Sequence, residues 1–125
     1  HYQQIDIALD TFPYTGHTTT CEALWMGVPV ITMLAETYFG RVAASMLSIL
    51  GLSDLVATHR NDYRDKAVQL AQNLSQLRDL HMTLRQKLKN SPLCDTQTYV
   101  RAIEQHYRTI WQEWCYTQLK NNYNH

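Results

Sequence analysis

Short apolar runs and turn residues alternate at the start of the chain. Residues 5–10 and 28–33 are apolar runs of strand length, with turn residues beside each of them. Between them, residues 18–26 place apolar side chains at helical spacing, and Gly27 follows. Because short apolar runs bounded by turns are typical of buried strands, and glycine commonly ends a helix, this segment predicts a strand–helix–strand unit. Such a unit is the building block of a parallel sheet with crossover helices.

A second helix is predicted after the second strand. It begins at Arg41 and stops at Gly51, and the small residues 43–45 would let it pack closely on a sheet. The apolar run at residues 55–57 predicts a short third strand at the sheet edge. The apolar face of the helix is expected to consist of Val42, Met46, Ile49 and Leu50.

Two long amphipathic helices are predicted in the second half of the chain. Asn61 or Asp62 begins the first, Asp62 can pair with Lys66 one turn later, and residues 90–92 end it. Asp95 begins the second. Their stripes are typical of helices that pack on a core, although a coiled coil is the alternative. The stripes are Tyr63, Ala67, Leu70, Leu74, Leu77, Leu84 and Leu88, then Tyr99, Ile103, Ile110 and Trp114 with Tyr107 and Trp111 beside them.

The turn between the first strand and the first helix carries the candidate chemistry. Gly16 permits close backbone approach, and Thr18 and Thr19 lie where a helix begins, so free N–H groups, hydroxyls and the helix dipole favour a phosphate. Glu22, one turn further, can accept hydrogen bonds from ribose hydroxyls. The pattern therefore indicates a nucleotide site. A helix capped by threonine with a solvated glutamate is the alternative, because no glycine-rich dinucleotide motif is present.

Composition excludes several classes of function. Eleven basic and eleven acidic residues cancel, which gives no electrostatic case for binding nucleic acid or an acidic membrane. No apolar run is long enough to span a membrane. Three scattered cysteines and six histidines form no metal motif, and the cysteines favour a reducing, cytoplasmic location. Cys21 lies in the first turn of a helix, where its thiol pKa is expected to fall, although a small packed residue is the simpler interpretation.

Residues 9–14, 16–29 and 41–45 closely resemble the C-terminal catalytic lobe of the O-GlcNAc transferase family, which includes the SPINDLY-type proteins. The resemblance continues through residues 55–57, 91–93 and 107–111, and so covers nearly the whole chain. It implies an α/β fold, a partial Rossmann-like lobe of a GT-B glycosyltransferase with a short parallel sheet, helices and two long C-terminal helices. We expect residues 1–125 to be the C-terminal part of the lobe that binds the nucleotide sugar, in a longer protein.

The resemblance also implies roles for the residues of the turn. His17, Thr18 and Thr19 would contact the pyrophosphate of the donor UDP-GlcNAc, and Glu22 would contact its ribose. Gly16, Thr20, Glu36 and Arg41 are weaker candidates, since Glu36 and Arg41 can instead form a structural ion pair. Without the resemblance, His17 would be a local turn contact, and Asp10 would organise the turn through its backbone.

The implied reaction is transfer of GlcNAc to Ser or Thr of an acceptor protein, without a metal or other cofactor. The catalytic residues, the base pocket and tetratricopeptide (TPR) repeats would lie upstream, so this fragment alone is expected to be inactive. Protein O-fucosyl transfer from GDP-fucose is the rival interpretation, because the plant SPINDLY proteins share residues 18–22. His17 and residues 41–45 favour the GlcNAc branch. A non-catalytic domain that supports an upstream repeat array is the alternative from another class.

Overall fold

The computed structural model describes residues 2–122. It divides after Cys94 into two compact units. The first unit holds the sheet and the candidate site, and the second is a single long helix. Short 3-10 helices lie at Tyr2–Gln4, Tyr38–Gly40, Ser53–Leu55 and Pro92–Cys94.

The sheet of the first unit has three parallel strands in the order β1-β2-β3. β1 (Ala8–Leu9) pairs with β2 (Val30–Met33), and β2 pairs with β3 (Val56–Ala57). Ala8 lies opposite Val30, and Thr32 lies opposite Val56. The predicted parallel arrangement is confirmed, with the run at residues 55–57 supplying the edge strand.

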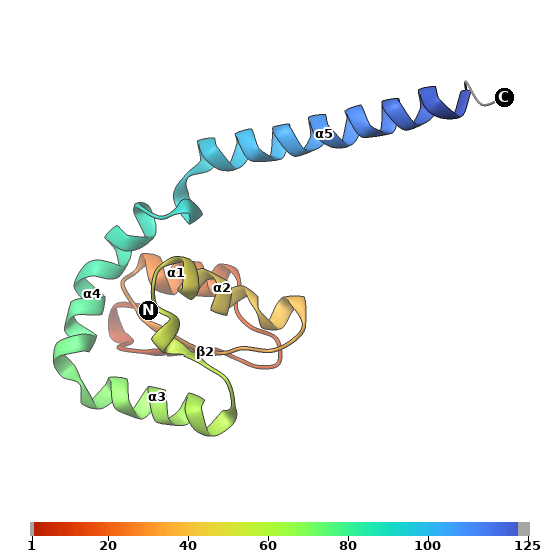
Figure 1. Ribbon diagram of the computed structural model, residues 1–125. Coiled ribbons are helices and arrows are strands. Elements are labelled where there is room, and N and C mark those ends of the chain that lie inside the picture. The colour runs from red at the N-terminus through yellow and green to blue at the C-terminus, as the bar shows by residue number, and fades with distance from the viewer. Residues whose placement is uncertain (1, 123–125) are drawn as a thin grey trace. The chain divides into compact units, whose positions relative to one another are not determined.

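Helices cover both faces of this sheet. α1 (Thr18–Trp25) connects β1 to β2, and α2 (Val42–Ile49) connects β2 to β3. Both lie on one side of β2, and α3 (Arg60–Gln72) lies on the other, as Figure 1 shows. Because β2 is covered on both faces, Val30, Ile31 and Thr32 are all buried. This central strand carries the core on which the flanking turns are fixed.

Two glycines end the crossover helices as the sequence predicts. Gly27 has a φ of +82° and Gly51 a φ of +71°, both in the left-handed region. After α1, the Gly27 N–H donates to the Leu24 carbonyl and the Val28 N–H to the Ala23 carbonyl. This pair of bonds is a Schellman motif, which satisfies carbonyls that the helix end leaves free. A Cβ on Gly27 would also lie 2.8 Å from the carbonyl oxygen of His81, so the site tolerates no side chain.

Two sequence-based predictions about burial in this part are wrong. The first strand is not a buried run over residues 5–10: only Ala8 and Leu9 pair with β2, and Leu9 is 59% exposed. In the described chain β1 is an edge strand of the sheet, so other elements cover only part of its side chains. In α2, the prediction fails at Ile49, which is exposed, and it missed Leu47, which is buried. Ala43 and Ala44 are buried as their small size predicts, and Leu50 just after the helix is buried as well.

The predicted long helix after β3 is two helices. α3 ends at Gln72, and α4 (Leu74–Lys89) begins after Asn73, whose side chain accepts a hydrogen bond from the Gln76 N–H and caps α4. The break turns Leu74 outward, 68% exposed, while Leu77, Leu80, Leu84 and Leu88 are buried. A regular leucine spacing continued across the break and concealed it. α4 packs against α1 and α3, and it ends before residues 90–92 as predicted.

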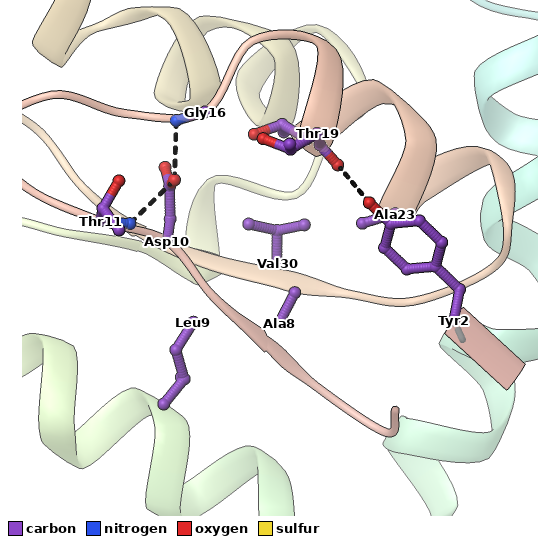
Figure 2. Close-up of a pocket in the computed structure, with 10 residues that line it drawn as sticks. Tyr2, Ala8, Leu9, Asp10, Thr11, Gly16, Thr19, Ala23 and Val30 are labelled. Atoms are coloured by element: carbon purple, nitrogen blue, oxygen red, sulfur yellow. Dashed lines mark hydrogen bonds between the residues drawn. The ribbon is translucent and has the colours of Figure 1, made fainter. Parts of the chain in front are cut away.

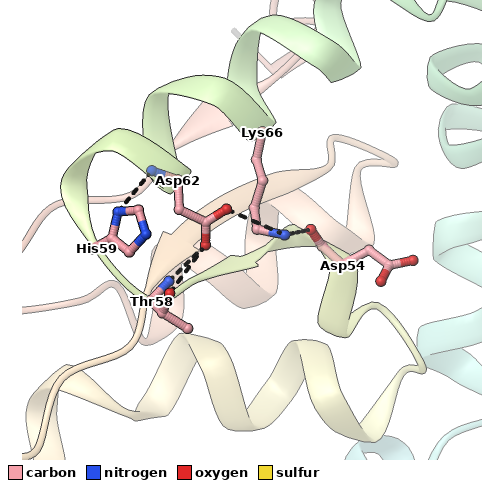
Figure 3. A network of polar contacts seen from close by, with 5 residues as sticks. All are labelled: Asp54, Thr58, His59, Asp62 and Lys66. Carbon is pink, nitrogen blue, oxygen red and sulfur yellow. Dashed lines mark hydrogen bonds and ion pairs between the residues drawn. The ribbon is translucent and has the colours of Figure 1, made fainter.

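The start of α3 is fixed by a dense polar network, shown in Figure 3. The predicted cap at Asn61 or Asp62 is wrong: the helix begins at Arg60 and its cap is His59, whose Nδ1 accepts the Asp62 N–H at 3.1 Å. Asp62 reaches back and accepts from the Thr58 N–H at 2.9 Å, which lowers the pKa of its carboxyl below the ordinary value. The predicted ion pair with Lys66 is present, with Nζ 3.8 Å from Asp62 Oδ1. Lys66 also donates to the Asp54 carbonyl at 2.8 Å.

The second unit is the helix α5 (Thr96–Asn122). Asp95 caps it as predicted, accepting the Thr98 N–H at 3.0 Å. Hydrogen bonding from the side chain and the backbone of Thr98 lowers the pKa of the Asp95 carboxyl. Its apolar stripe is not a core within the described chain: Tyr99, Ile110 and Trp114 are all more than half exposed. Trp111 and Trp114 stack with ring centroids 5.1 Å apart.

Candidate functional site

The candidate site lies where β1 ends and α1 begins. Open α/β sheets bind ligands beyond the carboxyl ends of their strands, and residues 10–17 form this edge. A cavity of about 180 Å³ opens here between β1, the turn and the first turn of α1. Figure 2 shows Asp10, Gly16 and Thr19 on its wall, with Tyr2 at the opposite end. Thr20 lines the cavity as well.

The N-terminus of α1 is open. The first bond of the helix runs from the Cys21 N–H to the His17 carbonyl, so the N–H groups of Thr18, Thr19 and Thr20 have no intrahelical acceptor. No side chain caps this end. Thr18 and Thr19 are exposed, as the sequence predicts, whereas Thr20 is buried. The arrangement leaves backbone donors and hydroxyls together at the positive end of a helix dipole, which is suited to an anion.

Gly16 brings the turn close to this helix end. A Cβ built on Gly16 would lie 2.5 Å from Thr19 Oγ1 and 2.7 Å from Thr20 Oγ1. Real Cβ atoms essentially never lie so near another atom, so a side chain at this position would displace the threonine hydroxyls or the turn. The predicted need for close approach at this position is therefore met, with the threonine hydroxyls as the neighbours.

The carboxylate of Asp10 organises the turn. Its Oδ1 accepts from the Gly16 N–H at 2.8 Å and from the Thr11 N–H at 3.0 Å, and its Oδ2 accepts from the Thr32 hydroxyl at 2.7 Å. The expectation that Asp10 organises the turn is confirmed, and its carboxylate takes part as well as its backbone. Its carbonyl does take part, accepting the Tyr63 hydroxyl at 2.7 Å. Asp10 thus joins the turn to β2 and α3.

His17 stands among aromatic rings at the entrance to α1. Its imidazole stacks on Tyr14, with ring centroids 5.9 Å apart, and meets the edge of Tyr38 at 6.1 Å. Tyr14 in turn stacks on Phe39 at 5.2 Å. The Nε2 atom of His17 is buried and lacks a hydrogen-bond partner among the described residues. A buried polar atom without a partner costs about 1–3 kcal/mol, so a ligand that forms a hydrogen bond with His17 Nε2 would bind more tightly.

Glu22 is held by the N-terminal segment. It is exposed on α1, one turn beyond the free N–H groups, and its Oε2 accepts the Tyr2 hydroxyl at 3.1 Å. The Tyr2 hydroxyl also lies 3.5 Å from the Thr19 carbonyl. Desolvation and the neighbouring Glu22 carboxylate raise the pKa of Tyr2. Glu22 therefore already binds one hydroxyl in the described structure, which is the kind of group that a ribose would present.

Glu36 and Arg41 lie apart from this cavity. They line a separate hollow of about 350 Å³ together with Leu34 and Ala35, beyond the carboxyl end of β2. The alternative of a structural ion pair is wrong within residues 2–122, where the ion pairs are Arg64–Asp65 and Lys66–Asp62. The Arg41 Nε instead donates to the Ala35 carbonyl at 3.2 Å. Both side chains are exposed.

Sequence reasoning also missed or misjudged some neighbours of the turn. Tyr2 and Tyr63 were not singled out as partners of the site, because each acts over a long sequence separation. The expected fall in the pKa of the Cys21 thiol is wrong: burial raises it, and the sulfur lies 3.6 Å from Met46 Sδ. Cys21 is exposed on the side of α1, with its sulfur against Met46.

Two further searches bear on the class of site. No helix among the described residues is long and apolar enough to cross a membrane. Across residues 2–122, no three His, Cys, Asp or Glu side chains gather in a way that could hold a metal ion. The donors at the turn are N–H and hydroxyl groups, which bind an anion without help from a cation.

Comparison with known proteins identifies the family. The model of Glycosyl transferase family 41 matches residues 1–103. The chain belongs to glycosyl transferase family 41.

Curated relatives of the family agree with this assignment. The SPINDLY protein of Solanum lycopersicum, named a probable UDP-N-acetylglucosamine–peptide N-acetylglucosaminyltransferase, is 46% identical over 91% of this chain. The SEC protein of Arabidopsis thaliana, with the same enzyme name, is 36% identical over 94% of this chain. In both cases the match spans 12% of the relative, so this chain corresponds to a small part of those proteins.

A solved structure of the family shows the same fold. A mutant of the O-GlcNAc transferase of Thermobaculum terrenum superposes with a TM-score of 0.85 at 40% sequence identity. The superposition covers 93% of this chain and 22% of that one. The predicted fold class, a partial Rossmann-like lobe of a GT-B glycosyltransferase, is confirmed.

Proposed function

We propose that this chain is the donor-binding part of a glycosyltransferase that transfers GlcNAc from UDP-GlcNAc to Ser or Thr of proteins. The observation that carries the proposal is the open N-terminus of α1 in a member of family 41, where an anion site and a family of nucleotide-sugar enzymes coincide. The names of the relatives supply the donor and the acceptor class.

In this proposal, different residues of the turn bind different parts of the donor nucleotide sugar. The N–H groups and hydroxyls at Thr18 and Thr19 bind the pyrophosphate, with His17 beside them. They stabilise the negative charge that develops on UDP as the bond to the sugar breaks. No metal or other cofactor is needed, because the fixed N–H donors and the helix dipole supply the positive potential. Gly16 and Thr20 shape the turn.

Glu22 binds the ribose hydroxyls in this proposal. Its hydrogen bond with the Tyr2 hydroxyl at 3.1 Å supports this role, because the carboxylate already accepts from a hydroxyl group. The donor nucleotide would replace the tyrosine or share the carboxylate with it. Glu36 and Arg41 lie in a separate hollow, and their exposed side chains are better suited to a more distant part of the substrates.

The remaining parts of the enzyme are expected outside this chain. The described turn offers binding groups and no residue placed as a catalytic base, so we propose that the base, the base-recognition pocket and any TPR repeats belong to the longer protein. The fragment alone should therefore not turn over UDP-GlcNAc. The cysteines within residues 2–122 are free thiols, which supports a reducing, cytoplasmic location.

A donor competition in the full-length protein tests the function. Transfer of labelled sugar to acceptor protein is measured with UDP-GlcNAc and with GDP-fucose in parallel. Transfer from UDP-GlcNAc supports the proposal, and transfer from GDP-fucose alone replaces it with the O-fucosyl alternative. That arm is included because the tomato SPINDLY protein is more similar to this chain than SEC is. Absence of transfer from either donor would favour the non-catalytic alternative.

A further inference from the structure

The Asp10 carboxylate connects three segments: the end of β1, the turn before α1, and β2. It lies at the end of β1 and binds the N–H of Gly16, which immediately precedes His17 and α1. Its second oxygen accepts the hydroxyl of Thr32, a fully buried residue on the central strand. The Asp10 side chain therefore anchors the turn to a fully buried residue of the central strand.

Tyr63 extends this anchor to the opposite face. Its hydroxyl donates to the Asp10 carbonyl at 2.7 Å, and its ring meets the edge of Phe12 with centroids 5.6 Å apart. Burial raises the pKa of the Tyr63 hydroxyl, so it remains a donor at neutral pH. The turn is thus held from β2 and from α3, on both sides of the strand that it follows.

We propose that Asp10 is a positioning residue for the phosphate-binding turn. Both of its oxygens are occupied by protein donors, so it acts on a ligand only through the placement of Gly16 and the start of α1. This inference rests on the proposed function, because it concerns the same pyrophosphate site. Groups that stabilise a bound charge act over short distances, and a displacement of about 1 Å can cost up to roughly a hundredfold in rate. An anchor of this kind therefore controls affinity for the phosphates rather than for the nucleoside.

Asp62 provides a matched control. It too is a carboxylate that accepts an N–H and a hydroxyl from one strand-to-helix junction, here both from Thr58, and it lies at the start of α3. The experiment measures the affinity of the full-length protein for UDP and for uridine, with melting temperature as a check, in the Asp10→Ala and Asp62→Ala variants. We expect UDP to bind roughly tenfold to a hundredfold more weakly to Asp10→Ala. Uridine affinity should stay within about twofold, and Asp62→Ala should bind both ligands like the wild type.

Several outcomes would overturn the positioning role. Asp10→Ala could bind UDP as tightly as the wild type, or lose UDP and uridine equally, or weaken UDP no more than Asp62→Ala. If Asp10→Ala fails to fold, Thr32→Val takes its place, since it removes the hydroxyl that bonds to Asp10 Oδ2 while keeping the side-chain volume. Selective loss of UDP in Thr32→Val supports the role, and wild-type affinity in Thr32→Val overturns it. A wild-type protein that binds no UDP refutes the proposed function, and the positioning role with it.

Discussion

The two helices that follow edge strands of the sheet begin in opposite ways. α3 starts after a short junction in which His59 accepts the Asp62 N–H and Asp62 accepts the Thr58 N–H, so the protein satisfies its own donors. α1 starts after a long turn, has no side-chain cap, and leaves the hydroxyls of Thr18 and Thr19 exposed. Figures 2 and 3 show the contrast. The difference shows that a carboxylate at such a junction can cap a helix end or can hold a turn beside the helix end and leave it uncapped.

The longer turn is what keeps the end of α1 open. The Asp10 carboxylate accepts hydrogen bonds from Thr11, Gly16 and Thr32, and none of these residues lies in α1. The Asp62 carboxylate accepts a hydrogen bond from Thr58, which lies just before α3. A helix end that lacks an internal partner is destabilised, and such a cost is retained where a ligand supplies the missing bonds. The predictions below test this contrast from its largest expected effect to its smallest.

The largest effect is expected from Gly16→Val. The added Cβ would lie less than 3 Å from the hydroxyls of Thr19 and Thr20, and would displace these donors or the turn itself. UDP affinity of the full-length protein should fall by roughly a hundredfold or more. Isothermal titration with UDP measures the loss. The matched control is Gly51→Val. Gly51 also flanks a helix, at the end of α2, but a Cβ added there has no atom within 4 Å. It should lower stability through its positive φ and leave UDP binding intact.

Thr19→Val is expected to have the next largest effect. It preserves shape and removes one hydroxyl donor at the open helix end. Loss of a hydrogen bond to a charged group costs about 1.5–3 kcal/mol, so UDP affinity should fall roughly tenfold to a hundredfold. Thr58→Val, at the closed junction, should reduce stability without changing UDP affinity. If Thr19→Val is folded and binds UDP as tightly as the wild type, the Thr19 hydroxyl does not contribute to ligand binding.

Much of this contrast could be predicted from the sequence. The spacing of apolar residues placed α1 at Thr18 and ended it at Gly27, because local propensities and turn residues decide these points. It could not place Asp10 against Thr32 or Tyr63 against Asp10, since these bonds join residues 22 and 53 positions apart. It also failed at Asn73, where a side-chain cap interrupts a leucine pattern that continues in the same period. Long-range polar partners are set by the folded sheet and leave no local signal.

Glu22→Gln is expected to have a smaller and more selective effect. Glutamine keeps the size of the side chain but lacks the negative charge that strengthens a hydrogen bond from a ribose hydroxyl. UDP should bind about tenfold more weakly, while 2′,3′-dideoxy-UDP should lose much less, since it has no hydroxyls to present. Parallel titrations with the two nucleotides separate the cases. Tyr2→Phe serves as the control, because it frees Glu22 from its present donor and should leave UDP binding unchanged or stronger.

The smallest effect concerns the closed junction and the pH. Hydrogen bonding from Thr58 lowers the pKa of Asp62 below its ordinary value of 3.8. A depressed carboxyl pKa stabilises the folded state above the ordinary value, and this contribution is lost as the pH falls through the lowered pKa. The difference in melting temperature between wild type and Asp62→Asn should therefore shrink on acidification. A difference that stays constant through the acid range would show that the charge of Asp62 does not stabilise α3.

The position of bound UDP tests the central claim most directly. A crystal structure of the full-length protein with UDP shows which groups contact the pyrophosphate. The account predicts phosphate oxygens within hydrogen-bonding distance, about 2.7–3.2 Å, of the N–H groups or hydroxyls of Thr18 and Thr19. It also predicts the ribose against Glu22, and the Asp10–Gly16 bond of 2.8 Å unbroken. A pyrophosphate bound away from the start of α1, with that helix end still empty, would contradict the account.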